Sequence, residues 1–420
     1  MKRRVVITGL GAMTALGEGI EPLWKACLEG RSGIGFTDPQ AAWNPVAAII
    51  RDFDPEKFVT QRKSLKLMAR DIQLAIAGAT LAMQDAALHS TSFNHERAGV
   101  IIGSGVLNHE LDELAAGVGP SLDGNGRLDL KKFGADGLGA LFPLWMLKYL
   151  PNMPACHISI LSDLEGPNNT LTTGASASLA AAGEAARIIE RGAAEVMLAG
   201  GAESKVNPLG FSQYKMLGAV LESQKGEPEK IYRPFDEHSN GFVVGEGAAF
   251  LVLEEFEHAK KRGARIYAEI LGFGSSSHSK KGRKVAMESA LEDAGVSHRD
   301  LEYLQASGLG TAEEDSWEAA AAQEVLDGAG PHVSVSASKP VTGFTGFSSG
   351  AMDLLISTMA LWHGTIPPVA NFERPLGDWE FEIVKGKPLR KKMKVAMTNA
   401  FGFNGPSVSM VTAAYPGGKK

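Results

Sequence analysis

Cysteine is nearly absent from this sequence of 420 residues, in which Cys27 and Cys156 are the only two. Two cysteines cannot build the several bridges that stabilise a small secreted domain. The first residues, MKRRVVITGLGAMTALG, turn to glycine and polar residues before an apolar segment of export length develops. We therefore expect a cytoplasmic protein without disulfides.

Long hydrophobic runs and a strong excess of one charge are also missing. No uninterrupted apolar stretch approaches the roughly 20 residues that cross a bilayer, so we expect no membrane partner. The chain has 42 Lys and Arg against 48 Asp and Glu, a formal net charge of -6. This slightly acidic balance gives no general attraction to phosphate backbones, so nucleic acid is not an expected partner.

The sequence also lacks the residue spacings that are typical of metal sites. The ten histidines form no His-x-x-x-His pair, and there is no Cys-x-x-Cys motif. We expect neither a metal site nor a cofactor.

Glycine, by contrast, is abundant at 49 residues and falls beside short runs of Val, Ile and Leu. Such runs at 5–9, 100–103, 196–201 and 249–253 predict buried strands. Helical stretches at 65–88 and 177–191 lie between them, so strands and helices alternate. The pattern predicts an α/β fold with a covered, mainly parallel sheet.

A similar order of elements begins again near Ile266, with a helix expected at 284–294 and strands at 301–305 and 333–336. We therefore predict two halves, residues 1–258 and 259–420. Residues 117–132 are polar and glycine-rich, which predicts a surface loop. The apolar residues that follow suggest either core or a buried subunit contact, and they include Phe142, Trp145, Met146 and Leu147.

Several segments resemble the β-ketoacyl-acyl carrier protein synthases in order and spacing. They are VVITGLGAMTALG, GPNNTLTTGASAS, RGAAEVMLAGGAES, the stretch from RPFDEHSNGF to RIYAEI, SKPVTGFTGFSSGA and NAFGFNGPS, and together they span nearly the whole chain. The resemblance implies a thiolase-like duplicated fold with five layers, α-β-α-β-α, that pairs as a dimer.

Condensing members of that family use a cysteine at the start of a buried helix and two histidines. The exposed amides and the dipole of such a helix start stabilise a thiolate. In this sequence the cysteine position falls on Ala175, and the histidine positions fall on Ser307 and Phe344. The histidines normally hydrogen-bond the thioester oxygen while the extender loses its carboxylate. The resemblance therefore implies a member that has lost all three catalytic side chains.

The surrounding framework matches the family. The resemblance implies a buried ion pair between Lys339 and Glu318, and Asp315 also keeps its place. Phe401 matches the phenylalanine that gates the site, although Asn404 replaces a glycine of the gating loop.

The other candidate nucleophiles are expected to have structural roles. Cys156 and His157 are adjacent, and neighbours in a strand point to opposite faces, so they cannot readily serve one reacting atom. Cys27 is expected to be a small core residue. Ser176 is displaced from Ala175 by about 100 degrees around the helix axis, so helix capping is its expected role. Ser307 is expected either to donate a hydrogen bond into the pocket or simply to fill the space of an imidazole.

The first hypothesis for function is therefore a subunit similar to a chain-length factor, without independent activity. It would pair as a heterodimer with a cysteine-bearing ketosynthase, receive chains from an acyl carrier protein, and shape the tunnel with Phe142, Trp145, Met146 and Leu147. The second is a homodimeric acyl-binding scaffold. The third is altered chemistry, either a decarboxylase or an acyltransferase acting through Ser176.

Overall fold

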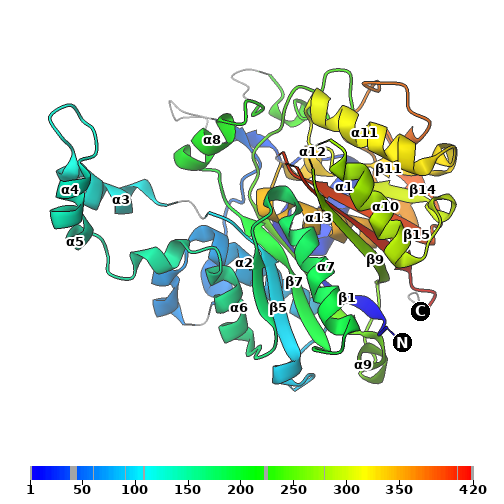
Figure 1. Cartoon of the computed structure of the whole chain (residues 1–420), viewed down its shortest axis with the longest axis horizontal. Coiled ribbons are helices and arrows are strands. Elements are labelled where there is room, and N and C mark those ends of the chain that lie inside the picture. Colours follow the sequence, from blue (N-terminus) through cyan, green and yellow to red (C-terminus); the bar gives the residue numbers. More distant parts are fainter. Residues whose placement is uncertain are drawn as a thin grey trace.

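The computed structural model describes residues 2–37, 45–59, 61–89, 91–106, 109–221, 226–278, 280–403 and 405–417. One mixed sheet runs through the molecule, with helices on both of its faces (Figure 1). Its first half consists of β6 (Asn168–Leu171), β5 (Ala98–Gly103), β7 (Val196–Glu203), β8 (Gly247–Glu255) and β1 (Val5–Thr14), in that order. Its second half continues with β9 (Ala268–Ser277), β16 (Pro406–Ala414), β15 (Val395–Phe401), β10 (Tyr303–Gln305), β11 (Ser334–Ser336) and β13 (Glu382–Ile383).

Both halves of the sheet repeat one pattern of strand directions. In the first half β1 and β7 are antiparallel to β8, while β5 is parallel to β7 and β6. In the second half β9 and β15 are antiparallel to β16, while β10 is parallel to β15 and β11. The predicted boundary at 258/259 falls inside α9 (Phe256–Lys261) and stays a prediction.

The expectation of a mainly parallel sheet is wrong, because each half contains two antiparallel pairings. Helices cover both faces, so the antiparallel strands are as fully buried as the parallel ones. β1 and β7 are buried at every residue. A continuous apolar run in the sequence indicates that a strand is buried, but it does not indicate the direction of the strand.

The helices form the remaining layers (Figure 1). α2 (Arg70–Asp85) packs on β1, β7 and β8, and α10 (Gly282–Ala294) packs on β9 and β16. Between the two halves lie α7 (Ala177–Glu190) and α13 (Ser349–His363), which contact each other. α13 is buried from Ser349 to Leu361, as expected of a helix that is apolar all round. α7 contacts β5 and β7 of the first half and β16 of the second, and α13 contacts β8 and β15. The two halves of the sheet therefore form two layers on either side of these helices, and the layer order is α-β-α-β-α.

Two local predictions need correction. Cys156 and His157 lie in α6 (Met153–Ser162) and not in a strand, because apolar residues without a clear period fit either structure. The predicted loop 117–132 is helical at both ends, where α3 (Leu111–Val118) finishes and α4 (Leu130–Lys132) forms after the Asp129 cap. Asp129 accepts hydrogen bonds from the backbone of Lys131 and Lys132, which stabilises that short turn.

Residues 109–150, which we name the arm, project from the body of the molecule (Figure 1). The arm contains α3, α4 and α5 (Leu138–Ala140). At its base Glu113 accepts hydrogen bonds from Lys148 and from the hydroxyl of Tyr149. These contacts tie the outgoing and returning segments together. In the described part of the chain, no helix is long and apolar enough to cross a membrane.

Candidate functional site

A cavity of about 290 Å³ lies beside Ala175. Ala175 belongs to a short 3-10 turn that leads directly into α7, and only 6% of it is exposed. Phe344 follows α12 (Lys339–Thr342) and lines the same cavity. The fold therefore brings two of the three predicted positions together, as a methyl group facing a benzyl group.

Phe344 is the centre of an aromatic cluster. Its ring centroid lies 4.9 Å from Phe242, 5.6 Å from Tyr214 and 5.6 Å from Phe403. The tilted and edge-to-face arrangements are those that aromatic pairs prefer. This side of the cavity is therefore apolar and closely packed, and it offers no proton donor of the imidazole type.

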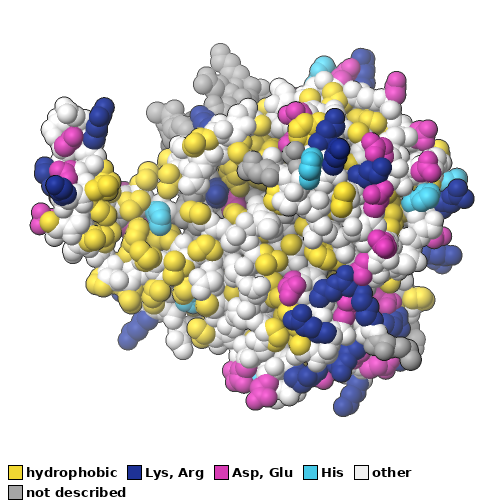
Figure 2. Space-filling model, in the orientation of Figure 1, with side chains coloured by type: hydrophobic (Ala, Val, Ile, Leu, Met, Phe, Trp, Pro, Cys, Tyr) yellow, Lys and Arg dark blue, Asp and Glu magenta, His cyan; other side chains and the backbone are white. Residues whose placement is uncertain are grey.

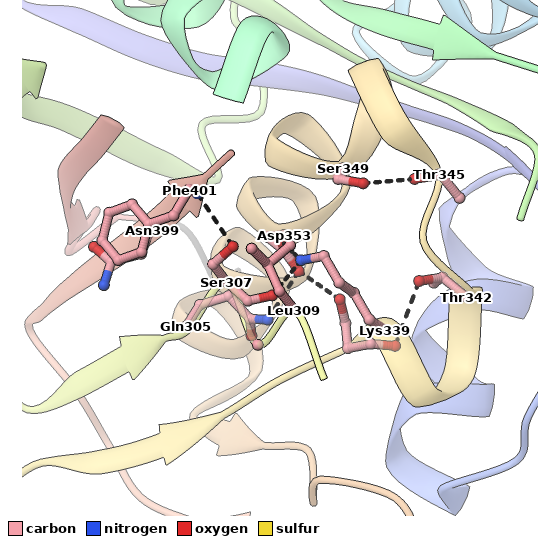
Figure 3. Close-up of polar contacts among 12 residues, drawn as sticks. Gln305, Ser307, Leu309, Lys339, Thr342, Thr345, Ser349, Asp353, Asn399 and Phe401 are labelled. Atoms are coloured by element: carbon pink, nitrogen blue, oxygen red, sulfur yellow. Dashed lines mark hydrogen bonds and ion pairs between the residues drawn. The ribbon is translucent and has the colours of Figure 1, made fainter. Parts of the chain in front are cut away.

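Ser307 is buried but does not line the cavity. Figure 3 shows its contacts with Phe401 and Lys339. Its Oγ accepts a hydrogen bond from the backbone N–H of Phe401 at 3.1 Å, and its carbonyl oxygen accepts one from Lys339. The expectation that Ser307 donates into the pocket is not supported, because Ser307 is not among the residues that line the cavity, and its Oγ faces the backbone N–H of Phe401. Filling the space of an imidazole is the role that remains.

Lys339 forms its ion pair with Asp353 and not with Glu318 (Figure 3). The Nζ of Lys339 lies 2.8 Å from Oδ2 of Asp353 on α13. Glu318 instead accepts hydrogen bonds from the backbone N–H groups of Ser307 and Gly308 and from the side chain of Asn399. The predicted pairing is wrong because helix α13 supplies a nearer carboxylate.

Asp315 is fully buried and holds loops in place. It accepts hydrogen bonds from the backbone N–H groups of Phe235 and Gly310 and from the hydroxyl of Ser239. Burial raises the pKa of Asp315 to about 7, and these hydrogen bonds oppose that shift. The residue is too enclosed to reach the cavity beside Ala175.

The side chain of Phe401 lies in the core of the second half and is only 1% exposed. The buried guanidinium of Arg283 lies 5.6 Å from its ring centroid and pairs with Glu314. The next residues along the chain, Gly402 and Phe403, line the cavity. The gating role of Phe401 stays a prediction, and Asn404 lies outside the described residues.

The alternative nucleophiles have ordinary surroundings. Ser176 lines a separate groove beside Phe273 and Ser407, and its Oγ donates to the carbonyl oxygen of Thr173 at 2.8 Å. It precedes α7 but makes no side-chain hydrogen bond to the helix start, so the predicted capping role is wrong. Cys27 is buried in the core as expected, and burial raises the pKa of its thiol to about 12.

Three residues at the cavity were missed from the sequence. Glu203 ends β7, and Lys205 and Tyr214 follow it. Glu203 accepts hydrogen bonds from the hydroxyl of Tyr214 and from the backbone N–H of Phe347. Gly346 allows this approach, because its φ is +50° and a Cβ would collide with the Glu203 carboxylate. A charged residue directly after a buried apolar strand was the available signal.

The four predicted tunnel residues lie on the arm and away from the cavity. Phe142 is 53% exposed and Met146 is 61% exposed, so the core alternative is wrong for both. Trp145 stacks on His109 at 4.9 Å, and Leu147 is half-buried. Figure 2 shows hydrophobic side chains gathered on the arm and on the adjoining body.

Among the described residues, no group of three His, Cys, Asp or Glu is arranged to hold a metal ion. The site is thus a buried, largely aromatic cavity at a helix start in a duplicated five-layer fold. That combination defines a thiolase-like protein with a ketosynthase-type site, and the described residues that line its cavity include no cysteine or histidine.

Comparisons with known proteins identify the family. The model of the β-ketoacyl synthase N-terminal domain matches residues 2–259, and the model of the C-terminal domain matches residues 267–373. Among curated relatives, 3-oxoacyl-[acyl-carrier-protein] synthase 2 of Coxiella burnetii is 36% identical, with 98% of each chain covered. The enzyme of the same name from Vibrio harveyi is 35% identical, again with 98% of each chain covered. The chain belongs to the β-ketoacyl synthase family.

Solved structures agree on the fold. A structure titled the ishigamide ketosynthase/chain length factor matches with a TM-score of 0.86 and 27% identity, over 99% of this chain and all of the other. A β-ketoacyl synthase from Burkholderia phymatum matches with a TM-score of 0.86 and 28% identity, over 99% of this chain and 100% of that one. A type II polyketide ketosynthase in complex with its acyl-carrier protein, named AntDE:AntF, matches with a TM-score of 0.85 and 25% identity at the same coverage.

Proposed function

We propose that this chain is a non-condensing subunit, similar to a chain-length factor, that pairs with a cysteine-bearing ketosynthase and shapes the acyl or polyketide chain made there. The observation that supports the proposal is the cavity beside Ala175, which the methyl group of Ala175 and the Phe344 ring both line. By the family resemblance, these residues stand at the positions of the nucleophile and of one histidine. A methyl group cannot form a thioester.

Among the described residues that line the cavity, none is a cysteine or a histidine. The hydroxyl of Ser307 accepts from a backbone N–H, and the hydroxyl of Tyr214 donates to Glu203. Removing one member of such a catalytic unit typically lowers the rate on the order of 10³ to 10⁶-fold, and removing the others adds less. Condensation by this chain alone is therefore expected to be negligible.

The exposed apolar surface of the arm favours the presence of a partner subunit. Its exposed apolar side chains include Phe142 and Met146, and Ile160 and Leu161 on α6 are exposed as well. Monomeric proteins rarely leave a contiguous apolar surface of this kind uncovered. The similarity to a solved ketosynthase/chain length factor favours a ketosynthase as the partner, and the similarity to a ketosynthase bound to its carrier favours an acyl carrier protein as the third component.

The two alternatives have less support. A homodimeric acyl-binding scaffold would also cover the arm, and the oligomeric state distinguishes it from a heterodimer. Altered chemistry through Ser176 requires a hydroxyl that faces the reacting atoms, whereas this hydroxyl is directed to Thr173 and lines a different groove.

Co-expression with candidate ketosynthases that carry an intact Cys-His-His set tests the proposal. We expect a stable heterodimer by size-exclusion chromatography with light scattering, and chain elongation from malonyl carrier protein only when both subunits are present. The matched control replaces the active cysteine of the partner by alanine, which should abolish elongation without dissociating the heterodimer. A self-sufficient homodimer would instead support the scaffold, and malonyl turnover by the isolated chain would refute the proposal.

A further inference from the structure

Lys205 is a buried ammonium group on the wall of the cavity beside Ala175. Lys205 is 9% exposed, and its Nζ makes one hydrogen bond to the described residues, which is to the amide oxygen of Gln213 at 3.3 Å. It also lies 5.0 Å from the ring centroid of Tyr214 and 5.9 Å from that of Phe347. An ammonium group has three N–H donors, so this one has unused donor capacity.

A buried lysine is normally paired with a carboxylate, because an unpaired charge in a poorly solvated place is costly. Among the residues that the structure describes, no carboxylate lies within salt-bridge distance of Lys205. Glu203 lines the same cavity and accepts from Tyr214 and Phe347, but it is not within ion-pair distance of Lys205. Asp71 is affected by the charge of Lys205, yet its Oδ1 accepts from Ser204, and burial raises its pKa to about 7.

The rest of the cavity is suited to a flat apolar group. Phe344, Phe347 and Phe403 line it, and Phe344 and Phe403 contact each other through their rings. Aromatic walls bind planar, conjugated groups by stacking and edge contacts. A volume of about 290 Å³ is at the small end of ligand pockets and admits a compact molecule.

We infer that this cavity binds, without a covalent bond, a small planar carboxylic acid whose carboxylate pairs with Lys205 and whose conjugated hydrocarbon part contacts the three phenylalanines. The inference rests on the proposed function in one respect only, namely that no acyl-enzyme forms at Ala175. The loss of the nucleophile converts a reaction site into a reversible binding site.

Isothermal titration of the purified full chain, without any partner subunit, tests the inference. The probes are trans-cinnamate, its uncharged analogue cinnamyl alcohol, and the non-planar acid 3-cyclohexylpropanoate. We expect cinnamate to bind with one site per chain. Cinnamyl alcohol should bind at least about tenfold more weakly, because it lacks the charge-assisted hydrogen bond to Lys205. The acid 3-cyclohexylpropanoate should also bind more weakly, because its ring is not planar and cannot stack on the aromatic walls.

Variants separate the ligand site from general effects. Lys205→Met should weaken cinnamate binding by about 10- to 100-fold and leave cinnamyl alcohol unaffected, and Lys205→Arg should restore most of the loss. Leu217→Trp fills the cavity from its partly exposed rim and should weaken both probes. Lys25→Met, at an exposed lysine of α1 (Ile20–Glu29), is the matched control and should change nothing.

Equal binding of the acid and the alcohol, an unchanged affinity in Lys205→Met, or no heat of binding at millimolar cinnamate would each overturn the inference. Thermal melting of every variant shows whether it is folded. If Lys205→Met does not fold, Lys205→Arg still tests the inference. The measurement uses the isolated chain, so its failure leaves heterodimer formation and elongation untouched. Failure of the co-expression experiment likewise leaves this result unaffected.

Discussion

Lys339 and Asp353 form an ion pair in which both side chains are almost fully buried, with 2.8 Å between Nζ and Oδ2. Lys339 also donates to the carbonyl oxygen of Ser307, and Asp353 accepts from Gln305. The pair thus joins α12, α13 and the end of β10 behind the cavity. These contacts fix the two helices and the strand end relative to one another.

Replacing one member of this pair should strongly destabilise the protein. Lys339→Met leaves the Asp353 carboxylate buried without its cation, and we expect the free energy of unfolding to fall by about 3–5 kcal/mol. Urea denaturation followed by circular dichroism measures the change. The double variant Lys339→Met, Asp353→Leu should recover part of the loss, because it removes both charges. A loss in the single variant no larger than that of the exposed Lys25→Met would contradict this account.

Hydropathy predicted the strands and helices that carry the site. The runs at 196–201 and 249–253 are parts of β7 and β8, and the stretch at 177–191 is α7 with a shift of one residue. These elements are long and fully buried, so their pattern is strong. The direction of the strands was not predictable, because a buried strand has the same composition in either direction.

The position of Ala175 and Phe344 on one cavity was predictable from motif spacing, but the charges around it were not. Asp353 is the only acid in the apolar helix α13, and a lone acid in such a helix indicates a buried partner. Lys205 stands beyond the end of β7, in a region where sequence alone does not distinguish a solvated loop from a cavity wall. Whether such a residue is solvated or lines a cavity depends on contacts between segments that are distant in the sequence.

Stability should depend on pH through Asp71. Burial raises the pKa of Asp71 to about 7 in the folded protein, whereas the pKa of an aspartate in an unfolded chain is about 3.9. Between these two pH values the folded state therefore binds more protons than the unfolded state. The stabilisation of the folded state that results is complete below about pH 4 and is lost as the pH rises through about 7. Glu203 and Lys205 are the charged neighbours that act on it, in opposite directions.

The variant Asp71→Asn isolates this contribution, since its Oδ1 can still accept from Ser204. The stability of the unmodified protein minus that of Asp71→Asn should decrease from pH 4 to pH 7 and stay constant above it. Urea unfolding at a series of pH values gives the difference. A difference that rises with pH would mean that the carboxylate is stabilised, and not destabilised, by its surroundings.

A cysteine placed at position 175 should be accessible and reactive, although it should not restore condensation. Ala175 lines the cavity at the start of α7, where exposed backbone amides favour a thiolate. In a Cys156→Ser background, Ala175→Cys should react with iodoacetamide much faster than Ser176→Cys, whose side chain lies outside this cavity. Intact-mass spectrometry over time gives both rates, and the buried Cys27 should stay unmodified.

The same Ala175→Cys variant should not elongate an acyl chain from malonyl carrier protein, because Phe344 and Ser307 provide no imidazole. Adding Ser307→His and Phe344→His tests whether the fold supports condensation once a cysteine and two histidines are present. We expect little recovery, since Phe344 is packed against three aromatic rings and its replacement disturbs them. Elongation by the single cysteine variant would show that the histidine positions are dispensable in this chain.

Charge on the arm should prevent assembly with the partner subunit and leave the chain folded. Phe142 and Met146 are more than half exposed, so a glutamate at either position meets water in the isolated chain and is buried only in a complex. We expect Phe142→Glu and Met146→Glu to weaken the heterodimer by at least about tenfold, with melting temperatures close to that of the unmodified chain. Val285→Glu, at an exposed apolar residue of α10 outside the arm, is the matched control and should assemble normally. Analytical ultracentrifugation measures the association, and undiminished assembly of both arm variants would place the interface elsewhere on the surface.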